Sequence, residues 1–317
     1  MNAVTRILFR NLPILVMFAC PAATADTDLL VSYELGGKVY QVQGSKTADG
    51  YLFNADEPGK SLKIMTLNWP PYIGEHTCKQ GWVQQLTIAL LHSRGYSVLS
   101  QFRPWARSVY EVENGMADIL YPEYLIEAEA PSDVFAKTKR LDHLALSNSF
   151  PGGSIALIKR RGEPDPYQGD LHNLKGSLIG VVRGYQNTPE FDALMDSGYF
   201  RVMETTNDQQ LAKMLVGNRV DLIIGDPKVI FTELSQVDLP GPQAASAIAK
   251  LEVLEPALQY NPLYFALSRK RPQWQQVQAD INQALNQFEK AGEIQAIINR
   301  TMESCSPPDD DEESNQQ

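Results

Sequence analysis

An alternation of strands and helices occurs twice in the sequence, and it constrains the fold more than any other feature. In each copy, three apolar runs are separated by two stretches whose apolar residues recur at helical spacing. The first copy occupies 63–121 and the second occupies 177–225. Because strands joined by helices run parallel, each copy requires a parallel sheet with helices on both faces. The sequence therefore predicts two α/β lobes.

The strand ends in these copies predict where a ligand would lie. In open parallel sheets, ligand sites are found beyond the carboxyl ends of the strands. The first copy has strand ends before Trp69-Pro70-Pro71-Tyr72 and near Tyr121, and the second has them before Arg183-Gly184-Tyr185-Gln186 and Asp226. If the two lobes face each other, the loops 68–72, 121–124, 183–187 and 225–227 line one cleft.

The rest of the chain adds segments around the two lobes. Gly36-Gly37 between apolar runs indicates a hairpin, a strand is expected at 262–267, and helices at 272–289 and 291–302 are expected to return to the first lobe. The expected layout is a signal peptide at 1–25, a β-rich N-terminal extension at 26–60, lobe 1 at 61–150 and 262–305, lobe 2 at 151–261, and a disordered acidic tail at 306–317.

The first 25 residues have the features of a secretory signal peptide. Arg6 and Arg10 precede a short apolar stretch that ends near Ala23-Thr24-Ala25, and cleavage is expected after Ala25. The apolar stretch is too short to span a membrane, so the mature protein is expected in the periplasm. An alternative is lipid modification at Cys20, although Met17 and Phe18 fit a lipoprotein cleavage site poorly.

Charge and cysteine content exclude several classes of function. The net charge of −10 argues against nucleic acid as a partner, because phosphate binding needs a concentrated basic face. The four histidines show no ligand spacing and no C-x-x-C occurs, so we expect no metal and no cofactor. After cleavage at Ala25, only Cys78 and Cys305 remain. They form either a disulfide, which an oxidising compartment favours, or two unpaired thiols.

Five short motifs, in order, resemble those of the family 3 solute-binding proteins, which serve bacterial amino-acid importers. They are Leu67-Asn68-Trp69-Pro70-Pro71-Tyr72, Glu113-Asn114-Gly115-Met116-Ala117-Asp118, Ser147-Asn148-Ser149-Phe150, Leu174-Lys175-Gly176-Ser177-Leu178-Ile179-Gly180-Val181, and the segment from Gly217 to Asp226. The resemblance covers 61–305. It implies a two-lobed periplasmic-binding-protein fold that closes on a ligand by a hinge motion near 149–154 and 258–263, without covalent chemistry. It also implies a monomer that serves an ABC transporter permease or a membrane sensor.

One departure from the resemblance bears on the ligand. Amino-acid binders of this family usually carry an arginine after the third strand that holds the ligand's carboxylate. The stretch 121–128 contains no arginine. Asp226 falls where the family places an acid for the ligand's ammonium group, so an amine-bearing ligand remains expected. Arg103, Arg107 or Arg183 could supply a positive charge from another direction.

Ten residues near the strand ends are the candidates for ligand binding. Trp69 and Tyr72 could stack on a planar or cationic ligand or pack beneath their loop. The other candidates have the same two interpretations, ligand contact or local structure: Trp105, Arg107, Tyr121, Glu123, Arg183, Tyr185, Gln186 and Asp226. Asp118 and Asp221 occupy matching positions before the third strand of each copy, and we interpret both as structural turn residues.

The function expected from these features is capture of a small polar, amine-bearing ligand between two lobes. Two alternatives remain open. The first is an enzyme of this fold, similar to cyclohexadienyl dehydratases, in which Glu123 would be a general acid. The second is an interaction or signalling module that acts through 27–60 or the acidic tail.

Overall fold

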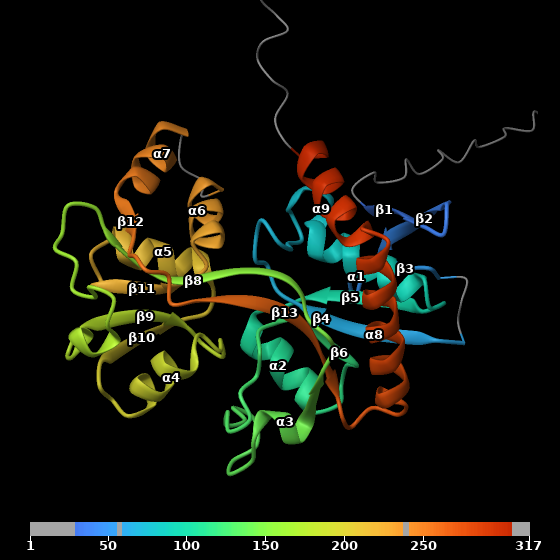
Figure 1. Ribbon diagram of the computed structural model, residues 1–317, viewed down its shortest axis with the longest axis horizontal. Coiled ribbons are helices and arrows are strands. Elements are labelled where there is room, and N and C mark those ends of the chain that lie inside the picture. The colour runs from blue at the N-terminus through green and yellow to red at the C-terminus, as the bar shows by residue number, and fades with distance from the viewer. Residues whose placement is uncertain (1–28, 56–58, 237–240, 306–317) are drawn as a thin grey trace, which may run out of the picture.

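The computed structural model describes residues 29–55, 59–236 and 241–305 (Figure 1). The predicted signal peptide and acidic tail lie outside these residues. Two lobes stand side by side, and two long strands run between them. The predicted α/β fold with two lobes is confirmed.

Lobe 1 is built on the first copy of the pattern. Strands β4 (Ser61–Thr66), β5 (Ser97–Phe102) and β6 (Ile119–Glu123) run parallel in the order β5-β4-β6. Helices α1 (Trp82–His92) and α2 (Trp105–Glu113) lie on opposite sides of these strands (Figure 1). The carboxyl ends of β4 and β6 therefore point toward the same edge of the sheet.

Lobe 2 repeats this arrangement with the second copy. Strands β9 (Leu178–Val182), β10 (Arg201–Thr205) and β11 (Leu222–Gly225) run parallel in the order β10-β9-β11. Helices α4 (Pro189–Asp196) and α5 (Asp208–Val216) flank them (Figure 1). The chain then continues through α6 (Pro227–Ser235), α7 (Gly241–Ala249) and β12 (Leu251–Val253).

Matching aspartates tie the third strand to the first in both lobes. Asp118 Oδ2 accepts a hydrogen bond from the backbone N–H of Lys63 at 2.8 Å. Asp221 Oδ2 accepts one from the backbone N–H of Leu178, also at 2.8 Å. The interpretation of both as structural residues is confirmed, and the two lobes share this detail of local chemistry as well as strand order.

The lobes are joined by β8 (Phe150–Arg160) and β13 (Gln259–Ser268), which pair antiparallel where they cross (Figure 1). β13 also pairs with β6 in lobe 1, and β8 pairs with β11 in lobe 2. A side chain at Gly152 would collide with the Asn261 carbonyl. Only glycine therefore allows the two crossing strands to approach this closely.

The N-terminal extension lengthens the sheet of lobe 1. β1 (Leu30–Leu35) and β2 (Lys38–Lys46) form the predicted hairpin around Gly36 and Gly37, whose φ angles are 61° and 74°. β3 (Tyr51–Phe53) then pairs antiparallel with β5. The β-rich extension is confirmed, and the sheet of lobe 1 is mixed because antiparallel strands flank its three parallel strands.

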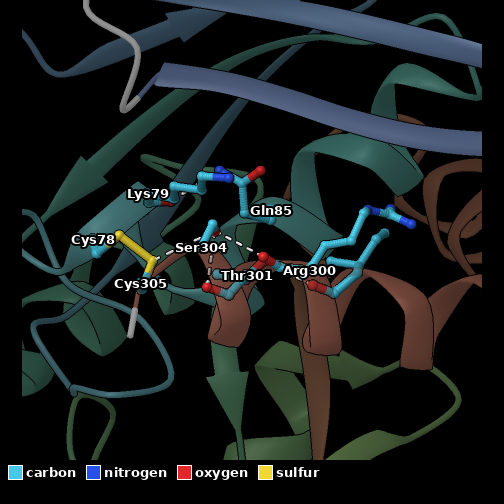
Figure 2. The surroundings of a disulfide bond; sticks show 8 residues. Cys78, Lys79, Gln85, Arg300, Thr301, Ser304 and Cys305 are labelled. Carbon is cyan, nitrogen blue, oxygen red and sulfur yellow. Dashed lines mark hydrogen bonds between the residues drawn. A yellow bond between two sulfur atoms is a disulfide. The ribbon is translucent and has the colours of Figure 1, made fainter. Parts of the chain in front are cut away.

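The C-terminal helices cover α1, which is therefore buried along its whole length except at its last residue. α8 (Trp274–Lys290) and α9 (Glu293–Ser304) pack against α1, and residues 82–91 are buried throughout. A disulfide joins Cys78, just before α1, to Cys305 at the end of α9, with a Cα–Cα distance of 5.8 Å (Figure 2). The disulfide thus anchors the C-terminal end of α9 to lobe 1.

Short elements complete the fold: η2 (Cys78–Gln80), α3 (Arg140–His143), β7 (Leu144–Leu146) and η3 (Leu171–Leu174). Within the described residues, every helix is either too short or too polar to traverse a bilayer.

Candidate ligand-binding site

The strand ends of the two lobes meet at a pocket between them. Its walls come from lobe 1, from lobe 2 and from the crossing strand β13, and they enclose a small cavity of about 20 Å³. The lining residues are Leu67, Trp69, Trp105, Pro122, Glu123, Tyr124, Tyr185, Gln186 and Leu263. Five of the ten predicted residues are therefore brought together here: Trp69, Trp105, Glu123, Tyr185 and Gln186.

Four aromatic rings form much of the pocket wall, in two perpendicular pairs. Trp69 and Tyr124 lie with ring centroids 5.8 Å apart and planes at 80°. Trp105 and Tyr185 lie 6.2 Å apart with planes at 86°. Trp69 also stacks on Tyr72 at 4.5 Å, which holds its ring in place. The pocket is thus bounded by rings that stand at right angles to one another.

Glu123 is the charged residue of the pocket wall. Its side chain is only 2% exposed, its Oε1 accepts a hydrogen bond from the Tyr124 backbone N–H at 3.0 Å, and its Oε2 has no hydrogen-bond partner. Burial raises the pKa of the Glu123 carboxyl to about 7, against the opposing effect of the nearby Arg140 guanidinium. Oε2 accepts no hydrogen bond, but it lies 3.7 Å from Nη1 of Arg140 and so forms an ion pair with that buried cation.

Tyr72 and Asp226 form a direct contact between the lobes. The Tyr72 hydroxyl donates to Asp226 Oδ2 at 2.8 Å, and Asp226 Oδ1 accepts from the backbone N–H of Lys228 and so caps α6. Burial raises the pKa of both groups. Both oxygens of Asp226 are thus hydrogen-bonded within the protein, beside the pocket and not in its wall.

The carbonyl of Gly184 is a second contact point between the lobes. It accepts a hydrogen bond from Trp105 Nε1 at 3.1 Å and another from Arg140 Nη2 at 3.2 Å. Next to it, the Tyr185 hydroxyl donates to Asp208 Oδ2 at 2.7 Å, and burial raises the pKa of Asp208 to about 6. Lobe 2 thus presents Tyr185 to the pocket with its hydroxyl already paired.

Three predicted residues lie elsewhere. Tyr121 sits inside β6 and packs in the core, where its hydroxyl hydrogen-bonds Ser100 and Gln84. Arg107 is exposed and pairs with Glu111, one helical turn away, at 2.7 Å. Arg183 is exposed and pairs with Glu204 at 2.8 Å. Long charged side chains at a surface reach solvent and neighbouring acids more readily than a narrow apolar pocket.

Arg140 was missed by reasoning from sequence, although it lies beside Glu123. It comes after a long loop beyond β6 and is fully buried. Its guanidinium lies 3.7 Å from Glu113, 3.7 Å from Glu123 and 2.8 Å from Asp133. Arg140 comes 17 positions after Glu123, so the loop between them concealed it from reasoning about the strand ends.

Tyr124 was also missed by reasoning from sequence, and a second cavity next to the pocket is rich in acidic residues. The Tyr124 hydroxyl is buried without a hydrogen-bond partner. A larger cavity shares Tyr185 and Gln186 with the pocket. It is lined by the predicted residue Arg183 and by the acids Glu127, Glu129, Asp133, Asp192, Asp196 and Glu204. Among the residues that the structure describes, no cluster of His, Cys, Asp and Glu could hold a metal ion.

Solved structures of binding proteins resemble this one. An ancestral arginine-binding protein bound to arginine is 18% identical, with a TM-score of 0.60 over 76% of this chain and 97% of its own. A histidine kinase sensor domain with similarity to periplasmic binding proteins is 16% identical, with a TM-score of 0.61 over 76% and 96%. An amino acid ABC transporter substrate-binding protein from Streptococcus pneumoniae bound to L-arginine is 13% identical, with a TM-score of 0.59 over 78% and 96%.

The chain has the periplasmic-binding-protein fold. No family model matches its sequence, and no curated protein matches it either. At these identities the likeness shows the fold alone, so the ligand has to be argued from the pocket.

Proposed function

We propose that the protein is a periplasmic solute-binding protein of family 3 that captures a small amine-bearing cation between its two lobes. The observation that carries the proposal is the pocket itself. Glu123 and three aromatic rings from lobe 1 meet Tyr185 and Gln186 from lobe 2. A ligand in this pocket contacts both lobes at once, so its binding favours closure.

The electrostatics of the site favour a cation. The only carboxyl group in the described wall is that of Glu123, and the adjoining cavity is lined by six acids and one base, Arg183. A cleft with acidic walls raises the local concentration of cations and speeds their arrival. A bound ammonium group also stabilises the ionised form of Glu123, which burial disfavours.

The predicted signal peptide, together with the fold, supports a role outside the cytoplasm. The similar structures include both a transporter's binding protein and a sensor domain. Delivery to an ABC importer permease or to a membrane sensor is therefore part of the proposal. A pull-down with ligand-loaded protein from solubilised membranes distinguishes a permease from a sensor kinase.

A thermal-shift panel tests ligand capture. The purified protein is unfolded and refolded to remove bound ligand, then mixed with primary and alkylated amines, polyamines, amino acids and dicarboxylates. A ligand at 100 times its Kd adds about 2.7 kcal/mol of stability, so a true ligand raises the melting temperature.

A matched pair of variants locates the binding site in this test. Glu123→Gln should weaken binding of the cationic hit at least tenfold, because it removes the carboxylate from the pocket. Glu163→Gln alters an exposed acid of lobe 2 that pairs with Arg160 at 2.6 Å, and it should leave binding unchanged. No cation binding to a folded protein, or a hit that Glu123→Gln does not affect, would contradict the proposal.

One observation favours a second candidate, an enzyme similar to cyclohexadienyl dehydratases. A buried cleft glutamate with a pKa of about 7 can act as a general acid near neutral pH. However, the dicarboxylate prephenate would meet Glu123 and the acidic cavity, which disfavour anions. Release of phenylpyruvate from prephenate, abolished by Glu123→Gln, would establish this activity, and an absence of turnover would exclude it.

A further inference from the structure

We propose that the protein binds a linear diamine or polyamine, with one primary ammonium group in the pocket between the lobes and a second in the adjoining acidic cavity. The inference rests on the proposed function, because it specifies how many charges the cation carries and where they bind. Three observations support it: the size and unpaired oxygens of the pocket, the junction between the pocket and the cavity, and the unpaired carboxylates in the cavity wall.

The pocket has room for a single small polar group. Its volume of about 20 Å³ corresponds to one water-sized group. In its wall, Glu123 is 2% exposed and Tyr124 is 8% exposed, and neither Glu123 Oε2 nor the Tyr124 hydroxyl has a hydrogen-bond partner among the described residues. The Gln186 side chain, which also makes no hydrogen bond there, adds an amide oxygen. A primary ammonium group is about as large as a water molecule and brings three N–H donors, which match these three oxygens.

The rest of such a ligand has to leave the pocket, which adjoins two further cavities at Tyr185. The acidic cavity, of about 560 Å³, shares Tyr185 and Gln186 with the pocket. A smaller cavity, of about 160 Å³, shares Leu67, Trp105 and Tyr185 with it. The described wall of the smaller cavity contains Arg103 and no acid, whereas that of the acidic cavity contains six acids and one base. These charges direct a cationic chain into the acidic cavity.

Two carboxylates of the acidic cavity have no partner within the described protein. The other four acids are occupied: Glu129 pairs with Lys139, Asp133 with Arg140 and Glu204 with Arg183, and Asp192 accepts from Asn187. The side chains of Glu127 and Asp196 make no hydrogen bond or ion pair with any described residue. Glu127 belongs to lobe 1 and Asp196 to α4 of lobe 2. Closure places both carboxylates in one cavity, and a second ammonium group there would offset their repulsion.

A carboxylate on the ligand would find no available cation along this path. None of the described residues of the pocket wall is Lys, Arg or His. The base of the acidic cavity, Arg183, is already paired with Glu204 at 2.8 Å. Arg140, which lies 3.7 Å from Glu123, is fully buried among three acids. A diamine should therefore bind more tightly than an amino acid that carries the same two nitrogens.

Calorimetric titration of the refolded protein with four probes tests this proposal. Putrescine has an ammonium group at each end of a four-carbon chain, and spermidine adds a third charged nitrogen. Butylamine keeps the chain and one ammonium group, and ornithine keeps both nitrogens but adds a carboxylate. We expect saturable binding of putrescine and spermidine, with butylamine and ornithine each at least tenfold weaker than putrescine.

Removing the unpaired carboxylates shows whether the acidic cavity binds the second charge. The double variant Glu127→Gln with Asp196→Asn should weaken putrescine binding at least tenfold and change butylamine binding less than twofold, because butylamine places no charge in the cavity. Glu123→Gln should weaken binding of both ligands, because both place an ammonium group in the pocket. Glu163→Gln changes an acid that pairs with Arg160 outside the cavity, and it should alter neither affinity. A melting curve for each variant confirms that it is folded.

Each contrary outcome has a distinct meaning. Butylamine binding as tightly as putrescine, with sensitivity to Glu123→Gln, would overturn the second charge site and leave cation capture standing. Ornithine binding as tightly as putrescine would also overturn the proposal, and its loss in Arg103→Ala would place the carboxylate in the smaller cavity. If none of the four probes and no amine of the wider panel binds the folded protein, both this inference and the proposed function are wrong.

Discussion

The two lobes share a framework but contribute unequally to the site. Both have strand order second-first-third, and Asp118 and Asp221 make the same hydrogen bond in each. Lobe 1 nevertheless supplies Leu67, Trp69, Trp105, Pro122, Glu123 and Tyr124 to the pocket, and lobe 2 supplies only Tyr185 and Gln186.

The difference lies in the segments that connect each strand to the next element. In lobe 1, a proline-rich aromatic loop comes after β4 and a long loop comes after β6. In lobe 2, β11 leads directly into α6 through its cap Asp226. Lobe 1 also carries the N-terminal strands, the C-terminal helices and the disulfide. Under the proposed function, we infer that lobe 1 is the platform that holds most of the pocket wall and that lobe 2 closes over it.

Removing the disulfide should have the largest effect, and it should fall on lobe 1. The double variant Cys78→Ala with Cys305→Ala opens a link between residues separated by 227 positions, at an expected cost of about 2–5 kcal/mol. Denaturant titration measures the loss. Hydrogen exchange should accelerate in α1 and α9 while β9 and β11 keep their protection. Equal acceleration of exchange in both lobes would show that the disulfide does not stabilise lobe 1 selectively.

A methyl group added at Gly153, where β8 and β13 cross, should push the two lobes apart. The added carbon of Gly153→Ala would collide with the Asp226 carboxylate and the Tyr72 hydroxyl, which bond across the cleft. Overpacking of this kind costs about 1–3 kcal/mol, so affinity for the cation should fall roughly tenfold or more. Gly59→Ala, with open space around its added carbon, is the control. An unaffected affinity in Gly153→Ala would mean that closure does not need this contact.

Cation affinity should depend on pH through the acid of lobe 1. The pKa of Glu123 is raised by burial to about 7, and a cation binds its ionised form. Affinity should therefore be constant above pH 8 and fall about tenfold per unit below pH 7. The charged groups around Glu123 are Arg140, Glu113 and Asp133. Without ligand, the raised pKa of Glu123 has the opposite effect on stability. The protonated carboxyl favours the folded state at low pH, and this contribution to the free energy of unfolding is lost as pH rises through 7.

Variants in the two lobes show which carboxyl group causes the pH dependence of affinity. Glu123→Gln should abolish this dependence. Asp208→Asn, which changes the buried acid of lobe 2 whose pKa is raised to about 6, should leave the dependence near pH 7 in place. Titrations at pH 6, 7 and 8 suffice. If the pH dependence of affinity is lost in Asp208→Asn instead, the carboxylate that binds the cation lies in lobe 2.

The smallest effect is expected from the exposed arginines, one in each lobe. Arg107 and Arg183 each pair with an acid of their own lobe at the surface. Exposed ion pairs contribute about 0–1 kcal/mol, and neither guanidinium lines the pocket. Arg107→Ala and Arg183→Ala should each change affinity less than twofold by calorimetry. A tenfold loss in either would mean that a surface arginine reaches the ligand.

Local sequence was sufficient to predict the framework. Five of the six strands of the two copies are short, largely buried runs, and β10 is the exposed exception. The expected helix 272–289 differs from α8 by only one or two residues at each end. The prediction of the hairpin depended on two consecutive glycines, which adopt positive φ in the structure. Each of these signals is contained in a few neighbouring residues, because burial and turn geometry impose their patterns locally.

Reasoning from sequence found residues of the pocket wall only where a side chain lies close to the end of a strand. Trp69, Glu123 and Tyr185 do so and line the pocket. Arg140 reaches its position only after the loop beyond β6 folds back, and nothing local indicates that three acids surround it. Asp226 was predicted to bind the ligand's ammonium group, but it lies outside the pocket wall and bonds Tyr72 of the other lobe, 154 positions away, which no local pattern indicates.

Cation binding in the aromatic pocket, between lobe 1 and a closing lobe 2, can be examined in a crystal structure of the protein with its tightest-binding cation. We predict that the ligand nitrogen lies within about 6 Å of the ring centroids of Trp69, Trp105, Tyr124 and Tyr185, and close to Glu123 Oε2. A ligand bound outside this pocket, or one whose nitrogen lies away from both the rings and Glu123, would contradict this prediction.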